Sequence, residues 1–325
     1  MSTPKDNLSG RIINKQYELL ERLVHRAITD QYRARQVFTG ETVLIEIFRE
    51  PSVDSETRER FWQHIHSLAG VKHPHIAPIL AHGETEEGRL YAVIQSVSGP
   101  TLADRLTEWQ TRGTLPSSVE ALRLVHALAD ALGVAHKAGI VHHNLRPSNI
   151  WLDDNNKPVL VDLVVPYVPL PPTPLETLRQ QKMLDYASPE QRAGEMIDER
   201  SNIYSLGIIL YELLAGHRPQ LPISDWHIFE HRSLPREVPL EQVKPGLSRA
   251  TYRLVKGCLW RQAWSRFETA EMMVKAIERA ISEEEETAII QSTHPRRLTI
   301  PRWLIYGGIV LIVAGTAVAS LLLLR

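Results

Sequence analysis

The sequence predicts an α+β chain with two lobes, followed by a transmembrane helix. Residues 17–97 contain runs of β-branched and aromatic residues that are typical of strands. From residue 98 onward the apolar residues recur every three or four positions, which indicates amphipathic helices. Strands first and helices second is an α+β pattern. Residues 303–324 differ from both regions because they are uncharged and mostly apolar.

The smaller predicted lobe, about residues 17–97, contains five strands and one helix. Its clearest strand is Thr42–Phe48, where β-branched residues dominate. The helix Ser55–Leu68 places Phe61, Ile65 and Leu68 on one face. The other predicted strands are residues 17–20, 31–38, 76–81 and 90–97.

Helices dominate the larger predicted lobe, about residues 98–281. Ser117–Ala138 carries a continuous apolar stripe, and Ile203–Leu214 is strongly apolar. Residues 102–108, 249–259 and 269–281 are further predicted helices, and 158–162 is a short strand. We interpret residues 1–16 as a polar N-terminal segment and residues 282–302 as a charged linker next to the membrane.

The segment 303–324 has 22 residues, which as a helix would span roughly 33 Å, enough to cross a bilayer core. A buried core helix is the alternative. Arg296, Arg297 and Arg302 precede the segment and only Arg325 follows it, so the preceding domain is predicted to be cytoplasmic. Small residues would let two such helices pair as a homodimer, or they reflect ordinary membrane-helix composition.

Composition narrows the remaining classes of function. The formal net charge is -1, which gives no electrostatic reason to expect a nucleic-acid partner. Cys258 is the single cysteine, so the chain cannot form an internal disulfide. Residues 1–10 lack the apolar core of a signal peptide.

Three ordered motifs resemble the bacterial serine/threonine protein kinase family. His142–Ile150 is similar to the catalytic loop H-R-D-L-K-P-x-N-I. Residues 186–191 are similar to the end of the activation segment, with S-P-E-Q, and residues 198–207 to D-x-R-S-D-I-Y-S-L-G. The resemblance covers residues 17–281 and implies the two-lobed protein kinase-like fold. It also implies a structural pair of Glu190 with Arg266, and a buttress at Asn202, where the family has Asp.

The catalytic loop departs from the family at the position of the catalytic base. Asn144 stands where the resemblance places Asp, and Arg146 stands where it places Lys. A kinase base must accept a hydrogen bond or proton from the substrate hydroxyl. A neutral amide can orient a hydroxyl, but it is no base near pH 7.

The glycine-rich loop that covers ATP phosphates in this family is also altered. Its three glycine positions align with Val24, Arg26 and Thr29. Either Arg26 contacts phosphate through its side chain, or the segment is a β-turn released from nucleotide binding. Glu46 replaces the phosphate-binding Lys, and His64 replaces its helix Glu. These two could form a pair of reversed polarity, or be unrelated solvated side chains.

The predicted adenine slot carries large or polar residues, namely Gln31, Leu44 and Trp151. We expect them to fill the space of a purine, unless Trp151 rotates away. The two metal-ligand positions of the family survive as Asn149 and Asp162, whose oxygens suit Mg²⁺.

Taken together, these departures favour a membrane-anchored, cytoplasm-facing pseudokinase that binds or scaffolds other proteins in signalling. In this interpretation the chain is not an enzyme and needs no cofactor. The alternative is a weakly active serine/threonine kinase that uses Asn149, Asp162 and Arg146, with ATP and Mg²⁺ as cofactors.

Overall fold

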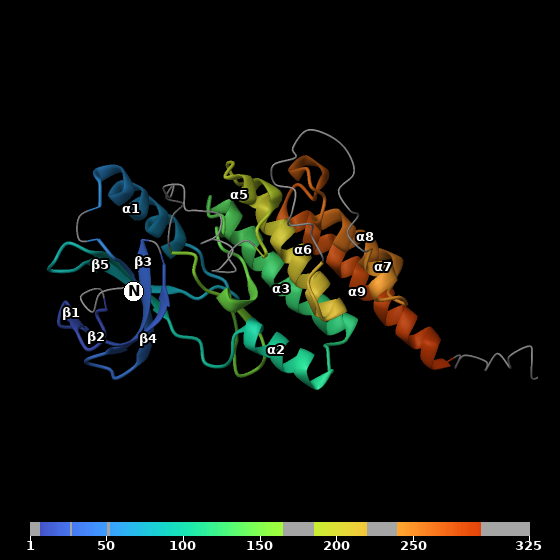
Figure 1. Ribbon diagram of the computed structural model, residues 1–325, viewed down its shortest axis with the longest axis horizontal. Helices are drawn as coiled ribbons and strands as arrows, with labels where there is room; N and C mark the ends of the chain where they lie inside the picture. The colour runs from blue at the N-terminus through green and yellow to red at the C-terminus, as the bar shows by residue number, and fades with distance from the viewer. Residues whose placement is uncertain (1–6, 27, 51–52, 165–184, 220–238, 294–325) are drawn as a thin grey trace, which may run out of the picture. The chain divides into compact units, whose positions relative to one another are not determined.

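The computed structural model describes residues 7–26, 28–50, 53–164, 185–219 and 239–293. The chain divides into two compact units, residues 1–284 and 285–325. Within the first unit a β-rich N-lobe precedes a helical C-lobe (Figure 1). The predicted two-lobed α+β architecture is therefore confirmed.

The N-lobe is an antiparallel sheet with the helix α1 (Ser55–Ala69) packed on its inner face. The strand order is β1-β2-β3-β4-β6-β5. Phe61, Ile65 and Leu68 of α1 are buried, as their spacing predicted. The strands are β1 (Ile12–Ile13), β2 (Tyr17–His25), β3 (Thr29–Gln36), β4 (Thr42–Phe48), β5 (Ile79–Glu84) and β6 (Leu90–Gln95).

Strand β4 is buried on both faces, and this determines where its one carboxylate lies. Val43, Ile45 and Ile47 belong to a cluster on the outer face of the sheet. Leu44 and Phe48 belong to the main core on the inner face. Because side chains alternate along a strand, Glu46 shares the inner face with Leu44 and Phe48. The carboxylate is therefore placed toward the C-lobe and is almost fully buried.

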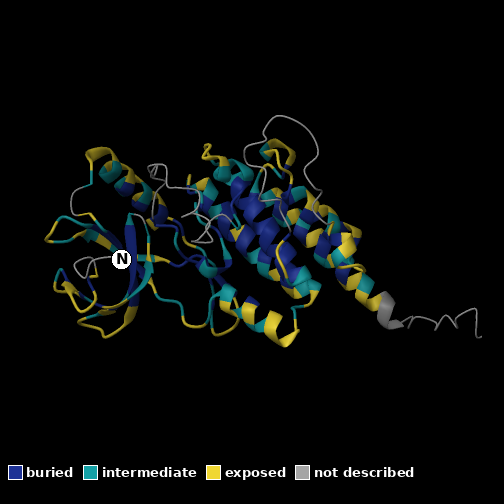
Figure 2. Cartoon of the chain, viewed as in Figure 1, coloured by how far each residue is buried: buried dark blue, intermediate teal, exposed yellow. Residues whose placement is uncertain are grey.

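The C-lobe is organised around α6 (Glu199–Ala215), a helix buried on all sides (Figure 2). Apolar residues surround it, as expected for a central core helix. Gly207 lets α6 approach α8 closely, since an added Cβ would lie 2.5 Å from the Cβ of Cys258. The other described elements are α2 (Leu102–Arg112), α3 (Ser118–Lys137), η2 (Pro147–Asn149), β7 (Ile150–Leu152), β8 (Pro158–Leu160), α5 (Pro189–Ala193), α7 (Leu240–Val243), α8 (Arg249–Cys258), η3 (Ala263–Ser265) and α9 (Ala270–Thr293).

The structure departs from the sequence prediction at both ends of the domain. Within the segment we interpreted as polar, Leu8 and Ile13 are buried against the outer face of the sheet, and β1 extends that sheet. Helix α9 continues to Thr293, so the predicted linker from residue 282 begins as helix. Among the residues that the structure describes, no helix is long and apolar enough to cross a membrane. The predicted transmembrane segment 303–324 lies outside those residues.

Candidate functional site

The loop His142–Ile150 is attached to the central helix α6 through Asn202. The Asn202 amide donates to the His142 carbonyl at 2.7 Å, and its oxygen accepts from the His142 N–H at 3.0 Å. Both backbone groups of His142 are thus satisfied by one buried side chain. Asn202 therefore buttresses the loop, as the resemblance implied, although the family residue at this position is Asp.

A cluster of three buried charges lies between the lobes. One Nη of Arg26 is 2.6 Å from Oε1 of Glu46, and the other is 3.0 Å from Oδ1 of Asp162. The Glu46 and Asp162 side chains are 2% and 5% exposed, and that of Arg26 is 19% exposed. Arg26, which directly follows β2, therefore connects to β4 through Glu46 and to the segment after β8 through Asp162.

The other oxygen of Asp162 is also occupied. Its Oδ2 accepts from the Asn149 amide at 2.8 Å and from the Asn144 amide at 3.2 Å. The second N–H of the Asn149 amide donates to the Asn144 carbonyl at 2.8 Å. Asp162 has a φ of 68°, an uncommon backbone conformation for a residue with a side chain. The two predicted metal positions thus meet, but they are bonded to each other and to a cation.

Burial and charge act in opposite directions on this cluster. Burial raises the pKa of the Glu46 carboxyl, the nearby charge of Asp162 raises it further, and Arg26 opposes both. Burial alone would lower the pKa of Arg26, but Asp162 and Glu46 raise it above its ordinary value. Arg26 therefore stays cationic and compensates two carboxylates that would otherwise repel each other at close range.

The predicted pair of Glu46 with His64 is not formed. Instead, His64 Nε2 lies 2.6 Å from the carbonyl oxygen of Leu163. Burial lowers the pKa of His64, and the Nε2–H that donates to the Leu163 carbonyl raises it by a smaller amount. The alternative of two solvated side chains is also wrong for Glu46, which is buried. Sequence spacing identified Glu46 and His64 as altered positions, but it could not show that Glu46 pairs with Arg26 instead of His64.

The glycine-loop positions lie where β2 leads into β3, and the Arg26 N–H donates to the Thr29 carbonyl at 2.9 Å. The Arg26 side chain points to carboxylates instead of an open phosphate site. Thr29 is fully buried at the start of β3, and Val24 pairs with Gln31 across the β2–β3 hairpin.

The three residues of the predicted adenine slot lie in the core of the domain or against it. Leu44 is 1% exposed and belongs to the main core, and Trp151 packs against that same core. Gln31 is buried, and its amide nitrogen has no hydrogen-bond partner among the described residues. Trp151 thus packs against the core, and the filling of the adenine slot stays a prediction.

Arg146 is half-buried in the same loop, and burial lowers the pKa of its guanidinium. The neighbouring histidines are held neutral, since burial lowers the pKa of both His142 and His143 to about 4. Neither imidazole therefore supplies a positive charge to the cleft near pH 7.

ATP with Mg²⁺, which the kinase resemblance implies, does not fit this arrangement. Asp162 uses both oxygens on side chains of the protein, so a metal would have to compete with Arg26, Asn144 and Asn149 for them. The Arg26 guanidinium already supplies the positive charge that a metal would bring. Glu46 adds a buried negative charge where phosphates would need a cation.

A structural ion pair stabilises the end of the activation-like segment. Arg266 donates from two nitrogens to the two carboxylate oxygens of Glu190 at 2.7 and 2.8 Å. The Arg266 side chain has no exposed surface. Burial raises the pKa of Glu190, but hydrogen bonds from Arg266 and Ser201 outweigh it and leave the pKa at about 2. The predicted Glu190–Arg266 pair is present in the structure.

Comparison with known proteins assigns the family. The family model of the protein kinase domain matches residues 27–276. The chain belongs to the protein kinase family. It is 29% identical to the serine/threonine-protein kinase PknB of Mycobacterium leprae, a match that covers 84% of this chain and 43% of that protein. It is also 29% identical to the serine/threonine-protein kinase PrkC of Bacillus subtilis, and this match covers 84% of this chain and 42% of PrkC.

The kinase domain of Mycobacterium tuberculosis PknI has the same fold, with a TM-score of 0.61 and 23% identity over 84% of this chain and 98% of that one. The chain spans less than half the length of PknB and PrkC. The kinase fold and the bacterial serine/threonine kinase family are therefore established for residues 27–276.

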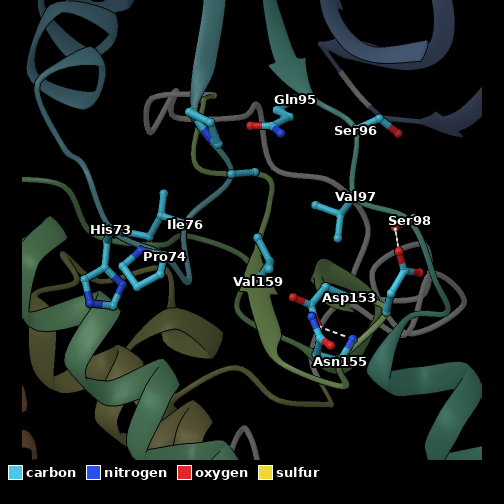
Figure 3. Close-up of a pocket in the computed structure, with 13 residues that line it drawn as sticks. His73, Pro74, Ile76, Gln95, Ser96, Val97, Ser98, Asp153, Asn155 and Val159 are labelled. Carbon is cyan, nitrogen blue, oxygen red and sulfur yellow. Dashed lines mark hydrogen bonds between the residues drawn. The ribbon is translucent and has the colours of Figure 1, made fainter. Parts of the chain in front are cut away.

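Sequence reasoning missed a cavity on this kinase domain, behind the segment that joins the lobes (Figure 3). It has a volume of about 480 Å³ and lies between residues 95–98, the loop before β5 and the β7–β8 turn. Ile76, Val97 and Val159 line it together with Asp153 and Asn155. None of the predicted nucleotide residues lines this cavity, which is thus separate from the Arg26 cluster.

Proposed function

We propose that this kinase-family chain is a pseudokinase, which binds and scaffolds other proteins instead of transferring phosphate. The observation that supports this most directly is the position of Arg26, which is paired with both Glu46 and Asp162. Asn144, at the base position, uses its amide to donate to Asp162. Kinases contribute mainly positioning and electrostatic stabilisation, and here both are directed at the protein's own side chains.

The second candidate is an active serine/threonine kinase, and the comparisons favour it over the pseudokinase. PknB and PrkC are both named serine/threonine-protein kinases. Asn149 and Asp162 also lie together, with an amide nitrogen 2.8 Å from a carboxylate oxygen. For this function Arg26 must leave the cluster, since Asp162 has no free oxygen while the pair is formed.

We further propose that residues 303–324 anchor the chain in a membrane with the kinase domain on the cytoplasmic side. The support is the length and apolar character of the segment and the three arginines that precede it. The partners would be other proteins at the membrane surface, including a second copy if the anchoring helices pair.

A phosphotransfer assay with labelled ATP and Mg²⁺ tests the two candidates. We expect no transfer by the parent chain, and none by Asn144→Asp, because the base is one of several missing groups that act as a unit. The matched variant is Asn144→Asp combined with Arg26→Gly and Glu46→Lys, which restores three family residues together. Transfer by the parent or by Asn144→Asp alone would establish the kinase candidate.

Thermal melting measures nucleotide binding separately from catalysis. A ligand that binds only the folded state raises the melting temperature by mass action. We expect melts with millimolar ATP, with and without Mg²⁺, to coincide with the melt of the free protein. A Mg²⁺-dependent rise in the parent would show that Arg26 gives way to nucleotide, and would contradict the closed site.

A further inference from the structure

The stretch from Gln242 to Phe267 contains six cations and no carboxylate, in a chain whose formal net charge is only -1. One of the six, Arg266, is buried and paired with Glu190. The other five are exposed. They are Lys244, Arg249, Arg253, Lys256 and Arg261. This part of the C-lobe therefore has cations without any carboxylate of its own to offset them.

Helix α8 places its cations on one face. Arg249, Arg253 and Lys256 are separated by four and three residues, so they lie above one another along the helix. The opposite face, with Leu254, Val255 and Cys258 among others, is buried against the core. The pKa of Glu283 is lowered mainly by hydrogen bonds from Arg279 and from the Ala250 N–H, and to a smaller extent by the charge of Arg253. We call Arg249, Arg253 and Lys256 the basic face of α8.

Two tryptophans continue the basic face beyond the end of the helix. The Trp260 ring lies under Lys256, with the ammonium 5.8 Å from the ring centroid. Trp260 is 45% exposed, and Trp264, which lies in η3, is 78% exposed. Charged side chains keep a solvent-exposed surface soluble, whereas two exposed indoles add nothing to its solubility. Tryptophan next to basic residues is typical of surfaces that lie at the membrane–water interface.

The chain leaves the domain close to this face. The backbone N–H of Ala250 donates to Glu283 at 3.0 Å, and the N–H of Ser248 donates to Glu284 at 2.7 Å. Only residues 285–302 lie between Glu284 and Trp303, where the predicted transmembrane segment begins. Because residues 285–293 belong to α9, these residues would span at most roughly 45 Å even if the rest were fully extended. The tether would therefore keep the N-terminal end of α8 within reach of the bilayer.

We propose that the basic face of α8, with Trp260 and Trp264, docks on an anionic phospholipid bilayer. The cations attract the negative surface of the leaflet, and the indoles enter the headgroup region. This contact would orient the domain, with the cleft held in a defined direction relative to the membrane. The proposal rests on the proposed membrane anchor, and it does not depend on whether the domain transfers phosphate.

An environment-sensitive dye on the full chain tests this docking. Gln262→Cys introduces an exposed thiol between the two tryptophans, whereas the native Cys258 is fully buried and burial raises the pKa of its thiol. The labelled chain is mixed with lipid nanodiscs of phosphatidylcholine alone, or with about one-third phosphatidylserine. We expect a blue shift only in the anionic discs, and its loss at high salt.

Charge variants identify the residues responsible. Each cation near an anionic surface contributes about fivefold to the docking constant, so Arg249→Gln, Arg253→Gln and Lys256→Gln together should lower it about 100-fold. The control is the combination Arg60→Gln, Arg112→Gln and Lys137→Gln, which removes equal charge from exposed sites elsewhere and should leave the shift unchanged. Trp264→Ala, on a highly exposed side chain, gives a second variant with little risk to folding.

Three outcomes would overturn the proposal. The first is equal dye emission in both kinds of disc, and the second is an equal loss of the shift in the control variant. The third is a shift caused by duplex DNA or polyglutamate in phosphatidylcholine discs when anionic lipid causes none. That last result would assign the face to a soluble polyanion instead of a membrane.

Discussion

At the level of single side chains, the cleft depends on how three buried charges compensate one another. Arg26 contacts Glu46 and Asp162, and both carboxylates are nearly inaccessible to water. Taking such charges out of water is costly, and removing one partner of a buried pair leaves an uncompensated charge. The cluster therefore makes the folded state sensitive to the loss of a single guanidinium.

Arg26→Ala should lower the free energy of unfolding by about 3 kcal/mol, because it leaves two buried carboxylates without a cation. Urea denaturation at pH 7 measures this. The control is Arg33→Ala, which removes an exposed ion pair with Glu21 and should cost less than about 1 kcal/mol. Equal effects of the two variants would contradict the view that Arg26 neutralises the cleft.

The penalty of Arg26→Ala should also depend on pH. Burial raises the pKa of Glu46 in the folded state. A carboxyl whose folded pKa is raised favours folding below its unfolded pKa, and this contribution is lost as pH rises through the folded pKa. The variant should therefore be closer to the parent in stability near pH 4.5 than at pH 7, as measured by urea titrations across that range.

Glu190 should show the opposite dependence. Its folded pKa is about 2, below the ordinary value of 4.5, so it stabilises the fold above pH 4.5 and loses this contribution as pH falls toward 2. The shift corresponds to about 3 kcal/mol. Glu190→Gln should lower stability at pH 7 and flatten the decline between pH 5 and 2. An unchanged acid profile would show that other carboxylates control acid unfolding.

At the level of elements, helix α9 supports the N-cap of helix α8, which is Ser248. Glu284 is buried and accepts from the Ser248 N–H at 2.7 Å, the Thr251 hydroxyl at 2.6 Å and the Ser118 hydroxyl at 2.9 Å. Two of these donors lie at the N-terminus of α8, where a negative charge is favourable. The carboxylate thus links α3, α8 and α9.

Glu284→Ala should destabilise the domain by about 2 to 3 kcal/mol, because several buried donors lose their acceptor. Thermal or urea unfolding gives this value. Glu284→Gln should cost less, since the amide oxygen can still accept. Glu278→Ala, on the exposed part of the same helix, should stay within about 0.5 kcal/mol of the parent. If Glu284→Ala left the free energy of unfolding unchanged, the part of α9 beyond Ile281 would be dispensable for the fold.

For the whole molecule, the proposed anchor makes a topological prediction. If residues 303–324 span the membrane with the arginine-flanked side inward, the kinase domain is cytoplasmic. Protease added outside intact cells should leave the domain uncut, while the same protease should cut it after the membrane is permeabilised. Digestion in intact cells would reverse the orientation, and release of the full chain by washing at high salt would exclude a transmembrane anchor.

Much of the fold was predictable because its signals are local. The apolar stripe of Ser118–Lys137 and the β-branched run of Thr42–Phe48 report their own geometry, and the ordered motifs identified the kinase fold. The buried N-terminal residues escaped prediction, because Leu8 stands alone among polar residues and Ile12–Ile13 is shorter than the runs that indicate a strand. Likewise, Glu283 and Glu284 belong to a run of four glutamates, which has the composition of a linker.

The chain's residue order was sufficient to show which family positions are altered, because a missing base, lysine or glycine is visible at its own place in a motif. Contacts between distant segments could not be obtained in this way. Arg26, Glu46 and Asp162 are far apart in sequence, and sequence spacing suggested His64 as the partner of Glu46 instead. The choice among partners depends on which side chain reaches the carboxylate in a site closed to water, and that geometry exists only after the two lobes have packed.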